Sequence, residues 1–295
     1  MKEIVVISGK GGTGKTSITA AFAILGGADI VVADCDVDAA DMHLLLKPVV
    51  KKEEDFFSGY AAEIDQNKCI SCGACASICR YHAISMEDGK YQVSGIDCEG
   101  CGYCYHVCPV EAINMVEQNV GKMYVSETKV GSIMVHARLR SGADNSGKLV
   151  ARVKKEAKQI AQDTGKEYVV VDGSPGIGCP VVASLSGADF VVLVTEPTVS
   201  GLHDLKRVSE LVAKFHIPSG CIINKADLNH AVSKQIESFL SHNNIVHIGN
   251  LPYDEAFTKA MTIGQTIIEY QDEDLAALLK ANWEQIKQLS TKERT

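Results

Sequence analysis

The sequence predicts an α/β protein whose mostly parallel sheet has helices on both faces and is interrupted by a small, cysteine-rich α+β insert. Short apolar segments typical of buried parallel strands alternate with helix-like segments along most of the chain. The first strand runs directly into a glycine-rich loop and a helix, and two cysteine runs break the alternation further on. We therefore expect a main domain from residues 1–59 and 118–295, with residues 60–117 as the insert.

Composition excludes several classes of function. The chain has 295 residues, 46% of them hydrophobic, and a net charge of −8, so we expect a large core and no binding of nucleic acid through bulk charge. No apolar run approaches the ~20 residues of a membrane span. The N-terminus enters a strand directly, which predicts a cytoplasmic protein without a signal peptide. Disulfides are unexpected in that compartment, so the 11 cysteines need another role.

The loop after the first strand has the pattern of a phosphate-binding loop. It reads S-G-K-G-G-T-G-K-T-S over residues 8–17, between an apolar strand (4–7) and a helix (17–25). Its glycines let backbone N–H groups surround an anion at the positive end of the helix. We expect Lys15 to reach the β- and γ-phosphates and Thr16 to hold Mg²⁺. The nucleotide-binding residues expected here are Gly9, Lys10, Gly11, Gly12, Thr13, Gly14, Lys15, Thr16 and Ser17.

A second lysine in this loop indicates which class of nucleotide-binding protein the sequence resembles. With Lys10 the loop reads G-K-G-G-T-G-K-T, which resembles the deviant Walker A loop of the MinD/ParA/nitrogenase-iron-protein ATPases. In that family the extra lysine reaches across a dimer to the partner's nucleotide. The resemblance implies an ATPase that acts as a homodimer, or as a heterodimer with a paralogous ATPase, and whose activity is stimulated by dimerisation and by a partner. A solvent-facing Lys10 is the alternative.

Aspartates follow two later strands, at the sheet edge where ligands bind in open α/β folds. Asp34 and Asp36 follow strand 30–33, and the resemblance maps them to switch I, with Asp36 orienting the attacking water and Asp34 near the metal. Asp172 ends strand 168–171 and resembles the Walker B aspartate that binds Mg²⁺ through water. The expected catalytic residues are Lys10, Lys15 and Asp36, and the expected Mg²⁺ residues are Thr16, Asp34 and Asp172. Asp38 is either a further carboxylate of this kind or the N-cap of a helix over 39–46.

The expected base-binding segment follows strand 221–223. It reads N-K-A-D, and the N-K-x-D spelling suggests guanine, whereas the resembled family uses this asparagine and a later P-x-D segment to hold adenine. Because the two-lysine loop is the more specific feature, we favour ATP over GTP. The base-pocket residues expected are Asn224, Lys225, Asp227, Pro252 and Asp254.

Eight cysteines form two runs with the same spacing, C-x-x-C-x-x-C-x-x-x-C. This is the pattern of two-cluster bacterial ferredoxins, in which the fourth cysteine of each run serves the other cluster. It predicts one [4Fe–4S] cluster on Cys69, Cys72, Cys75 and Cys108, and a second on Cys79, Cys98, Cys101 and Cys104. Structural zinc is the alternative. Arg80 stands where a proline usually follows the fourth cysteine of a run.

The charged stretch 51–55 lies before the insert, and we expect it to be a solvated connector.

Three remaining segments carry weaker signals. Helix 149–163 is basic, and we expect a solvated face or a docking site for an acidic electron-transfer partner. Cys179 occupies the place of a cysteine that bridges a cluster in the nitrogenase iron protein, so it is a candidate extra redox residue or ligand, although Asp144 and Asn145 stand in the loop that resembles the second bridging segment. Cys35 and Cys221 are expected in the core, and the C-terminal helix (272–289) is expected to pack on the domain.

The chain as a whole resembles MinD-superfamily ATPases with an inserted two-[4Fe–4S] ferredoxin domain, which occur chiefly in anaerobes and archaea. The expected cofactors are ATP or ADP, Mg²⁺ and two [4Fe–4S] clusters, in the cytoplasm of an anaerobe. The first hypothesis is ATP-dependent electron transfer through the clusters to a redox partner protein. The alternatives are an iron–sulfur carrier of the Mrp type and a MinD/ParA-like positioning ATPase whose clusters sense redox state.

Overall fold

The computed structural model describes residues 1–37, 40–140, 146–270 and 273–291 and has two compact units. The first, here called the sheet unit, comprises the described residues among 1–54, 122–138 and 146–291. The second, here called the cysteine unit, comprises residues 55–121 with residues 139 and 140. The chain passes between the units along β3 (Val49–Ile64) and β6 (Ile113–Glu127). The boundaries 60–117 expected for an inserted domain stay a prediction.

Nine strands form one sheet in the order β11-β10-β9-β1-β8-β2-β7-β6-β3. The pairs that join β11 to β7 in this order are all parallel, which confirms the α/β fold with a mostly parallel sheet. The strands besides β3 and β6 are β1 (Lys2–Ser8), β2 (Ile30–Asp34), β7 (Ile133–Leu139), β8 (Tyr168–Asp172), β9 (Phe190–Thr195), β10 (Ser219–Ile223) and β11 (Val246–Asn250).

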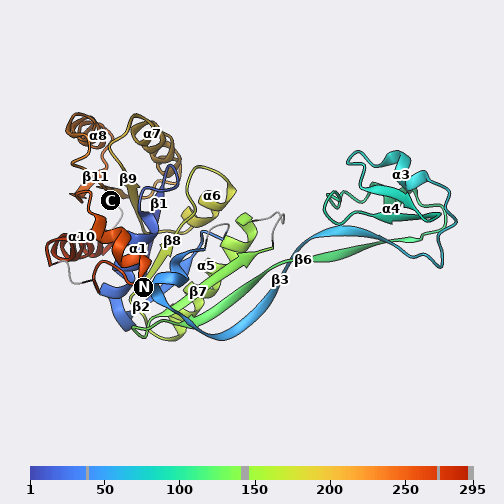
Figure 1. Ribbon diagram of the computed structural model, residues 1–295, viewed down its shortest axis with the longest axis horizontal. Helices are drawn as coiled ribbons and strands as arrows, with labels where there is room; N and C mark the ends of the chain where they lie inside the picture. The colour runs from blue at the N-terminus through green and yellow to red at the C-terminus, as the bar shows by residue number, and fades with distance from the viewer. Residues whose placement is uncertain (38–39, 141–145, 271–272, 292–295) are drawn as a thin grey trace. The chain divides into compact units, whose positions relative to one another are not determined.

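Helices cover both faces of this sheet (Figure 1). Ile4 and Val6 of β1 face a core shared with α1 and α10, whereas Glu3 of the same strand faces α5. The helices of the sheet unit are α1 (Lys15–Gly26), α2 (Met42–Leu46), α5 (Ser146–Asp163), α6 (Cys179–Leu185), α7 (Val199–Lys214), α8 (His230–His242), α9 (Glu255–Thr262) and α10 (Glu273–Thr291), with a 3₁₀ turn, η1 (Gly27–Asp29), after α1.

The C-terminal helix α10 belongs to the core. Trp283 stacks on Phe22 of α1 with ring centroids 5.4 Å apart, and Leu279 and Ile286 on the same face are fully buried. Burying such side chains contributes roughly 1.5–3 kcal/mol each. The prediction that this helix packs on the domain is confirmed. No helix in the described part of the chain combines the length and apolarity that a bilayer crossing needs.

The expectation of a solvated connector at 51–55 is confirmed in part: four of these five residues are exposed, but the segment is not irregular, because it lies within the edge strand β3. Their charged side chains form ion pairs with neighbouring elements: Lys51 Nζ lies 3.0 Å from Glu127 of β6, and Arg152 of α5 lies 3.5 Å from Glu54. Charged side chains also protect an edge strand from pairing with other chains. A run without hydrophobic periodicity was therefore compatible with a strand.

The basic helix α5 is only partly solvated. Lys154 is buried, with its Nζ 2.7 Å from both Glu3 Oε1 and the Ser186 carbonyl oxygen, and it also donates to the Ser184 carbonyl. Burial raises the pKa of Glu3, while Lys154 acts in the opposite direction. This lysine therefore joins α5 to β1 and to the end of α6, and is not available to a partner.

The cysteine unit repeats one backbone pattern. Its short helices α3 (Ala74–Ile78) and α4 (Tyr103–Val107) follow Gly73 and Gly102, whose φ angles are 78° and 77° in the left-handed region that glycine tolerates. Both helices end at the fourth cysteine of a run, and a hairpin of β4 (Ile84–Glu87) and β5 (Lys90–Val93) lies between them. The cysteine spacing that occurs twice in the sequence thus corresponds to a local structure that also occurs twice.

Candidate functional site

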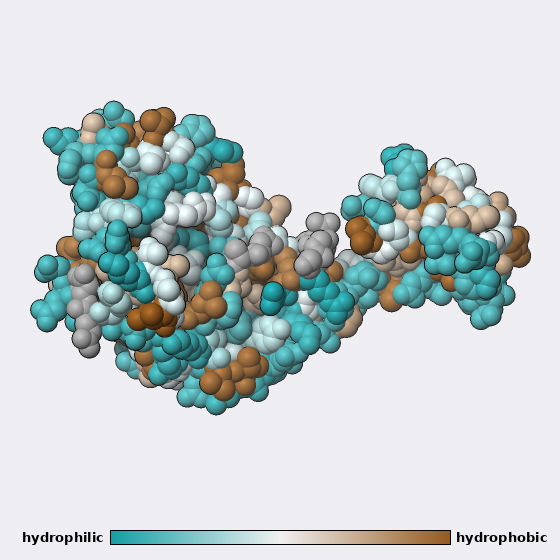
Figure 2. Space-filling model, in the orientation of Figure 1, coloured by the Kyte–Doolittle hydropathy of each residue, from teal (hydrophilic) through white to brown (hydrophobic). Residues whose placement is uncertain are grey.

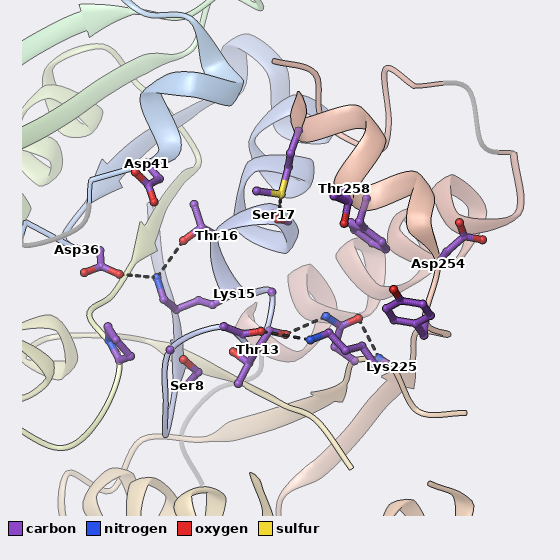
Figure 3. Close-up of a pocket in the computed structure, with 18 of the residues that line it drawn as sticks. Ser8, Thr13, Lys15, Thr16, Ser17, Asp36, Asp41, Lys225, Asp254 and Thr258 are labelled. Carbon is purple, nitrogen blue, oxygen red and sulfur yellow. Dashed lines mark hydrogen bonds and ion pairs between the residues drawn. The ribbon is translucent and has the colours of Figure 1, made fainter. Parts of the chain in front are cut away.

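A cavity of about 590 Å³ opens at the carboxyl ends of the central strands of the sheet unit (Figure 3). This is the position at which open α/β sheets bind ligands. The phosphate-loop part of its wall is formed by Ser8, Gly11, Gly12, Thr13, Gly14, Lys15, Thr16 and Ser17. The remaining wall is formed by Asp36, Asp41, Ser174, Pro175, Pro180, Asn224, Lys225, Pro252, Tyr253, Asp254, Phe257, Thr258 and Met261.

The loop's shape depends on a close approach at Gly14. Its φ is 89°, and a Cβ there would lie 2.3 Å from Nδ2 of Asn224. That same Nδ2 donates to the Thr13 carbonyl oxygen at 2.8 Å, so the base segment fixes the loop just before α1 begins. Any side chain at Gly14 would have to displace this contact.

Lys15 lies at the centre of a buried ionic network. Its Nζ is 2.8 Å from Asp172 Oδ1 and 3.5 Å from Asp36 Oδ2, and the lysine is 5% exposed. Figure 3 shows Lys15 directed toward Asp36. Burial alone would lower the pKa of Lys15, but Asp172 and Asp36 outweigh it and the pKa is raised. Lys15 therefore stays an ammonium group, as phosphate binding requires.

Asp172 accepts two further hydrogen bonds, from hydroxyl groups of α1. Thr16 Oγ1 donates to its Oδ2 at 2.8 Å and Thr19 Oγ1 to its Oδ1 at 2.9 Å. These contacts tie the end of β8 to the first turn of α1, and they place the Thr16 hydroxyl beside the Walker B-like carboxylate.

Asp34 lies next to Asp172, since the two are register partners on β2 and β8. Burial and the Asp172 charge raise the pKa of Asp34 well above its usual range. Its Oδ1 accepts from the Asp36 backbone N–H at 3.2 Å, and its Oδ2 is buried without a hydrogen-bond partner. An unsatisfied buried carboxylate oxygen costs free energy unless a donor or cation supplies its partner.

Within the described residues, no group of three or more His, Cys, Asp or Glu side chains is arranged to hold a metal ion. A phosphate-loop Mg²⁺ needs no such group, because a hydroxyl, waters and phosphate oxygens complete its coordination. The hydroxyl of Thr16 with the carboxylates of Asp172 and Asp34 is a donor set of this kind.

Lys10 lies apart from the cavity, since it is not among the residues that line it. Its Nζ is 2.7 Å from Glu196 Oε1 and 2.9 Å from Ser200 Oγ, both in the segment that joins β9 to α7. The lysine is therefore held by its own chain, and it is not simply directed into solvent.

The base segment contributes most of the residues expected for it. Asn224, Lys225, Pro252 and Asp254 line the cavity, but Asp227 does not. The Oδ1 atom of Asp227 accepts from the Tyr253 backbone N–H at 2.6 Å, which holds the P-x-D segment in place. The aspartate of the N-K-x-D spelling thus has a structural partner, and the choice of adenine over guanine stays a prediction.

Sequence reasoning missed the outer wall of this part of the cavity. Tyr253 and three residues of α9, Phe257, Thr258 and Met261, line it, and Ser17 Oγ donates to the Met261 sulfur at 3.3 Å (Figure 3). The signal was present, because residues 257, 258 and 261 follow the P-x-D segment at the spacing of one helix face.

In the cysteine unit, two small cavities each have one predicted set of four cysteines in their walls. One is lined by Cys69, Cys72, Cys75 and Cys108, and the other by Cys79, Cys98, Cys101 and Cys104. A backbone N–H group points at a cysteine sulfur in each of them: Ala112 N lies 3.2 Å from Cys108 Sγ and Ala62 N lies 3.5 Å from Cys98 Sγ. Such N–H contacts stabilise thiolate charge.

The surface beside these cavities is apolar in places (Figure 2). Ile70 is 62% exposed and lines the first cavity, and Tyr103 is 56% exposed and lines the second. The guanidinium of Arg80 lies 5.9 Å from the centre of the Tyr103 ring. Arg80 therefore places a positive charge near the second cavity, where the other half of the repeat has Pro109.

The remaining cysteines divide as expected. Cys35 and Cys221 are buried in the sheet, where burial raises the pKa of both thiols. Cys179 is exposed at the start of α6, with its side chain near Gly147 of α5. Asp38, Asp144 and Asn145 lie outside the described residues. Whether Cys179 ligates anything stays a prediction.

Comparison with known proteins identifies one family. A family model described as the CobQ/CobB/MinD/ParA nucleotide binding domain matches residues 4–267. The uncharacterized protein MJ0578 of Methanocaldococcus jannaschii is 36% identical over 230 residues, 77% of this chain and 79% of that protein.

Solved structures of the same fold include two MinD proteins. The septum site-determining protein MinD of Pyrococcus horikoshii, complexed with Mg-ADP, has a TM-score of 0.58 and 16% identity, covering 98% of this chain and 97% of that one. The MinC:MinD cell division complex of Aquifex aeolicus has a TM-score of 0.56 and 16% identity, covering 100% and 99%. At these identities the likeness shows the fold alone.

The position of Asp227 predicts how its variants bind nucleotides. Asp227→Asn keeps an oxygen for the Tyr253 N–H, so we expect ADP affinity within about 3-fold of wild type and an unchanged preference for ADP over GDP. Asp227→Ala loses that hydrogen bond and should weaken ADP binding about 3–10-fold. Isothermal titration calorimetry with both nucleotides measures this. Tighter binding of GDP by the wild-type protein, lost selectively in Asp227→Asn, would contradict the assignment.

Proposed function

The chain belongs to the CobQ/CobB/MinD/ParA nucleotide-binding family, and from this premise we propose that it is a Mg²⁺-dependent ATPase of the MinD/ParA type. The observation that carries the proposal is the buried network in which Lys15 contacts Asp172 and Asp36 beside a 590 Å³ cavity. It brings together a phosphate-binding cation, a metal-side carboxylate and a candidate for orienting water.

The residues of the network and of the phosphate loop have different roles in the proposed phosphoryl transfer. The backbone N–H groups of Gly12, Gly14 and Lys15 surround the β-phosphate, and the Lys15 ammonium stabilises the charge that develops on the transferred phosphoryl group. Asp36, 3.5 Å from that ammonium, accepts a hydrogen bond from the attacking water and aligns it. Lys10 of a second copy would supply a further positive charge.

Thr16, Asp172 and Asp34 would hold Mg²⁺, which, when bound there, neutralises charge on the β- and γ-phosphates. In the resting protein Thr16 Oγ1 donates to Asp172 at 2.8 Å. This hydrogen bond orients the Thr16 hydroxyl beside Asp172, and Asp34 lies next to Asp172 on the neighbouring strand.

We propose that the ATPase works as a dimer with a protein partner, as a homodimer or with a paralogous ATPase. Support comes from Lys10, which lies outside its own chain's cavity, and from the resemblance to a MinC:MinD complex. A MinD/ParA-type cycle, in which nucleotide state controls partner binding, is the form of the proposal that the comparisons favour.

The role of Asp36 has a direct test. Asp36→Asn keeps the side-chain shape but is a much weaker acceptor for the water proton, so we expect ATP hydrolysis to fall at least ~100-fold. ATP affinity should stay within about 5-fold of wild type, as measured by calorimetry alongside phosphate release. Asp163→Asn, at the exposed end of α5, is the matched control with both values unchanged. Near-normal turnover in Asp36→Asn would overturn the assignment.

A second function rests on a different observation. We propose that the two four-cysteine cavities bind two [4Fe–4S] clusters and that the protein couples nucleotide state to electron transfer with a redox partner. When bound, such clusters accept and donate single electrons at potentials set by exposure and hydrogen bonds. The cysteine sets, the N–H groups aimed at Cys108 and Cys98, and the exposed edges at Cys72 and Cys101 fit this use.

Covalent connectivity suggests how the two functions are linked. The segment after Asp36 leads through α2 into β3, and β3 carries the chain into the cysteine unit. A change at Asp36 on nucleotide turnover would therefore act on the element that enters that unit. An iron–sulfur carrier role would instead need a labile site, for which the exposed Cys179 is the candidate.

Metal analysis of anaerobically purified protein tests the second function. We expect about eight irons and eight sulfides per chain, and loss of about half the iron in Cys101→Ser. Cys179→Ser is the matched control with no loss. Zinc in place of iron would contradict the cluster assignment. EPR-monitored potentials that differ between ADP and a non-hydrolysable ATP analogue would support electron transfer, and equal potentials would favour the positioning role.

A further inference from the structure

The ammonium group of Lys10 has a complete set of acceptors within its own chain. Its Nζ lies 2.7 Å from Glu196 Oε1, 2.9 Å from Ser200 Oγ and 3.3 Å from Thr198 Oγ1. An ammonium group has three N–H donors, so these three oxygens satisfy it. The strongest of the three contacts is the charge-assisted one to Glu196.

The segment that carries these acceptors is itself fixed. Thr198 caps α7 by accepting from the Gly201 backbone N–H at 2.9 Å. A Cβ at Gly201 would lie 2.3 Å from the Glu196 carbonyl oxygen, so the tight turn from β9 into α7 requires glycine there. The positions of these acceptors are therefore fixed by contacts that do not involve Lys10.

Glu196 also connects Lys10 to the nucleotide cavity. Its Oε2 lies 3.0 Å from Lys225 Nζ, and Lys225 lines the cavity and reaches the Gly12 carbonyl oxygen at 3.3 Å. The Glu196 side chain is 14% exposed, so both ion pairs are partly shielded from water. One carboxylate thus joins Lys10 of the phosphate loop to Lys225 of the base segment.

We propose that Glu196 is a positioning residue that holds Lys10 in a resting arrangement and sets the threshold for ATP-dependent dimerisation. The inference rests on the proposed function, because it assumes that Lys10 acts on the nucleotide of a second copy. Lys10 cannot donate all three N–H groups to its own chain and to a partner's phosphate at once. Dimerisation must therefore break at least one of the three contacts. The charge-assisted contact with Glu196 is the strongest of them, so the fraction of Lys10 released from Glu196 is the competent one.

Glu196→Gln tests the proposal with little change of shape. A neutral amide lacks the negative charge and has an NH₂ donor in place of one acceptor oxygen, so it holds the two ammonium groups less tightly and Lys10 is released more often. With saturating ATP, we expect the dimer dissociation constant to fall about 10-fold, measured by sedimentation equilibrium. At protein concentrations below the wild-type dissociation constant, ATP turnover per chain should rise by a similar factor. ATP affinity of the monomer should stay within about 3-fold.

Two further variants distinguish the loss of a contact with Lys10 from the loss of a negative charge elsewhere on the surface. Ser200→Ala removes one neutral acceptor and should tighten the dimer by a smaller factor, about 2–3-fold. Glu210→Gln removes one carboxylate from an exposed position on α7 and should change nothing. An unchanged or weaker dimer in Glu196→Gln, or an equal effect in Glu210→Gln, would overturn the proposal.

Amine labelling gives a readout that does not depend on ATPase function. In the nucleotide-free monomer, a water-soluble N-hydroxysuccinimide ester should label Lys10 several-fold faster in Glu196→Gln than in wild type, relative to the exposed Lys234. Equal labelling would overturn the resting contact itself. If labelling changes but wild type shows no ATP-dependent dimer, the proposed function fails while the contact between Glu196 and Lys10 stands.

Discussion

The ion pair between Lys15 and Asp172 is the interaction on which the rest of the site depends. Both side chains are almost completely buried, and removing one partner of such a pair typically costs about 3–5 kcal/mol because the other charge is left uncompensated. Asp172 avoids this cost by accepting from Lys15, Thr16 and Thr19 together. The pair fixes the phosphate loop to the end of β8 before any nucleotide binds, so the site is preorganised.

The two lysines of the loop have opposite environments, which suits different tasks. Lys15 is enclosed by carboxylates of its own chain beside the cavity, whereas Lys10 lies outside the cavity and contacts Glu196, in the segment that joins β9 to α7. Glu196 and Lys225 link these regions through one carboxylate. A continuous chain of contacts therefore runs from Lys10 through Glu196 to Lys225 at the wall of the cavity.

Local patterns were enough to predict the parallel sheet, the phosphate loop and both four-cysteine sets, because each depends on spacing along the chain. The ion-paired edge strand at 51–55 could not be predicted, since its partners, such as Glu127 and Arg152, are distant in sequence. The resting partner of Lys10 was hidden for the same reason: Glu196 lies 186 residues away in a turn without a motif. Asp227 shows the opposite limitation. Its N-K-x-D motif is familiar as a nucleotide-binding pattern, but its side chain accepts a hydrogen bond from the Tyr253 backbone and does not line the cavity.

The central claim is that this chain is an ATPase whose active site is completed by a second copy. The most direct measurement is ATP turnover per chain as a function of protein concentration, at saturating ATP and Mg²⁺. A dimer-dependent site predicts that turnover per chain rises with concentration to a plateau and that Lys10→Ala removes the rise. Turnover that is independent of protein concentration, and unaffected by loss of Lys10, would contradict the account.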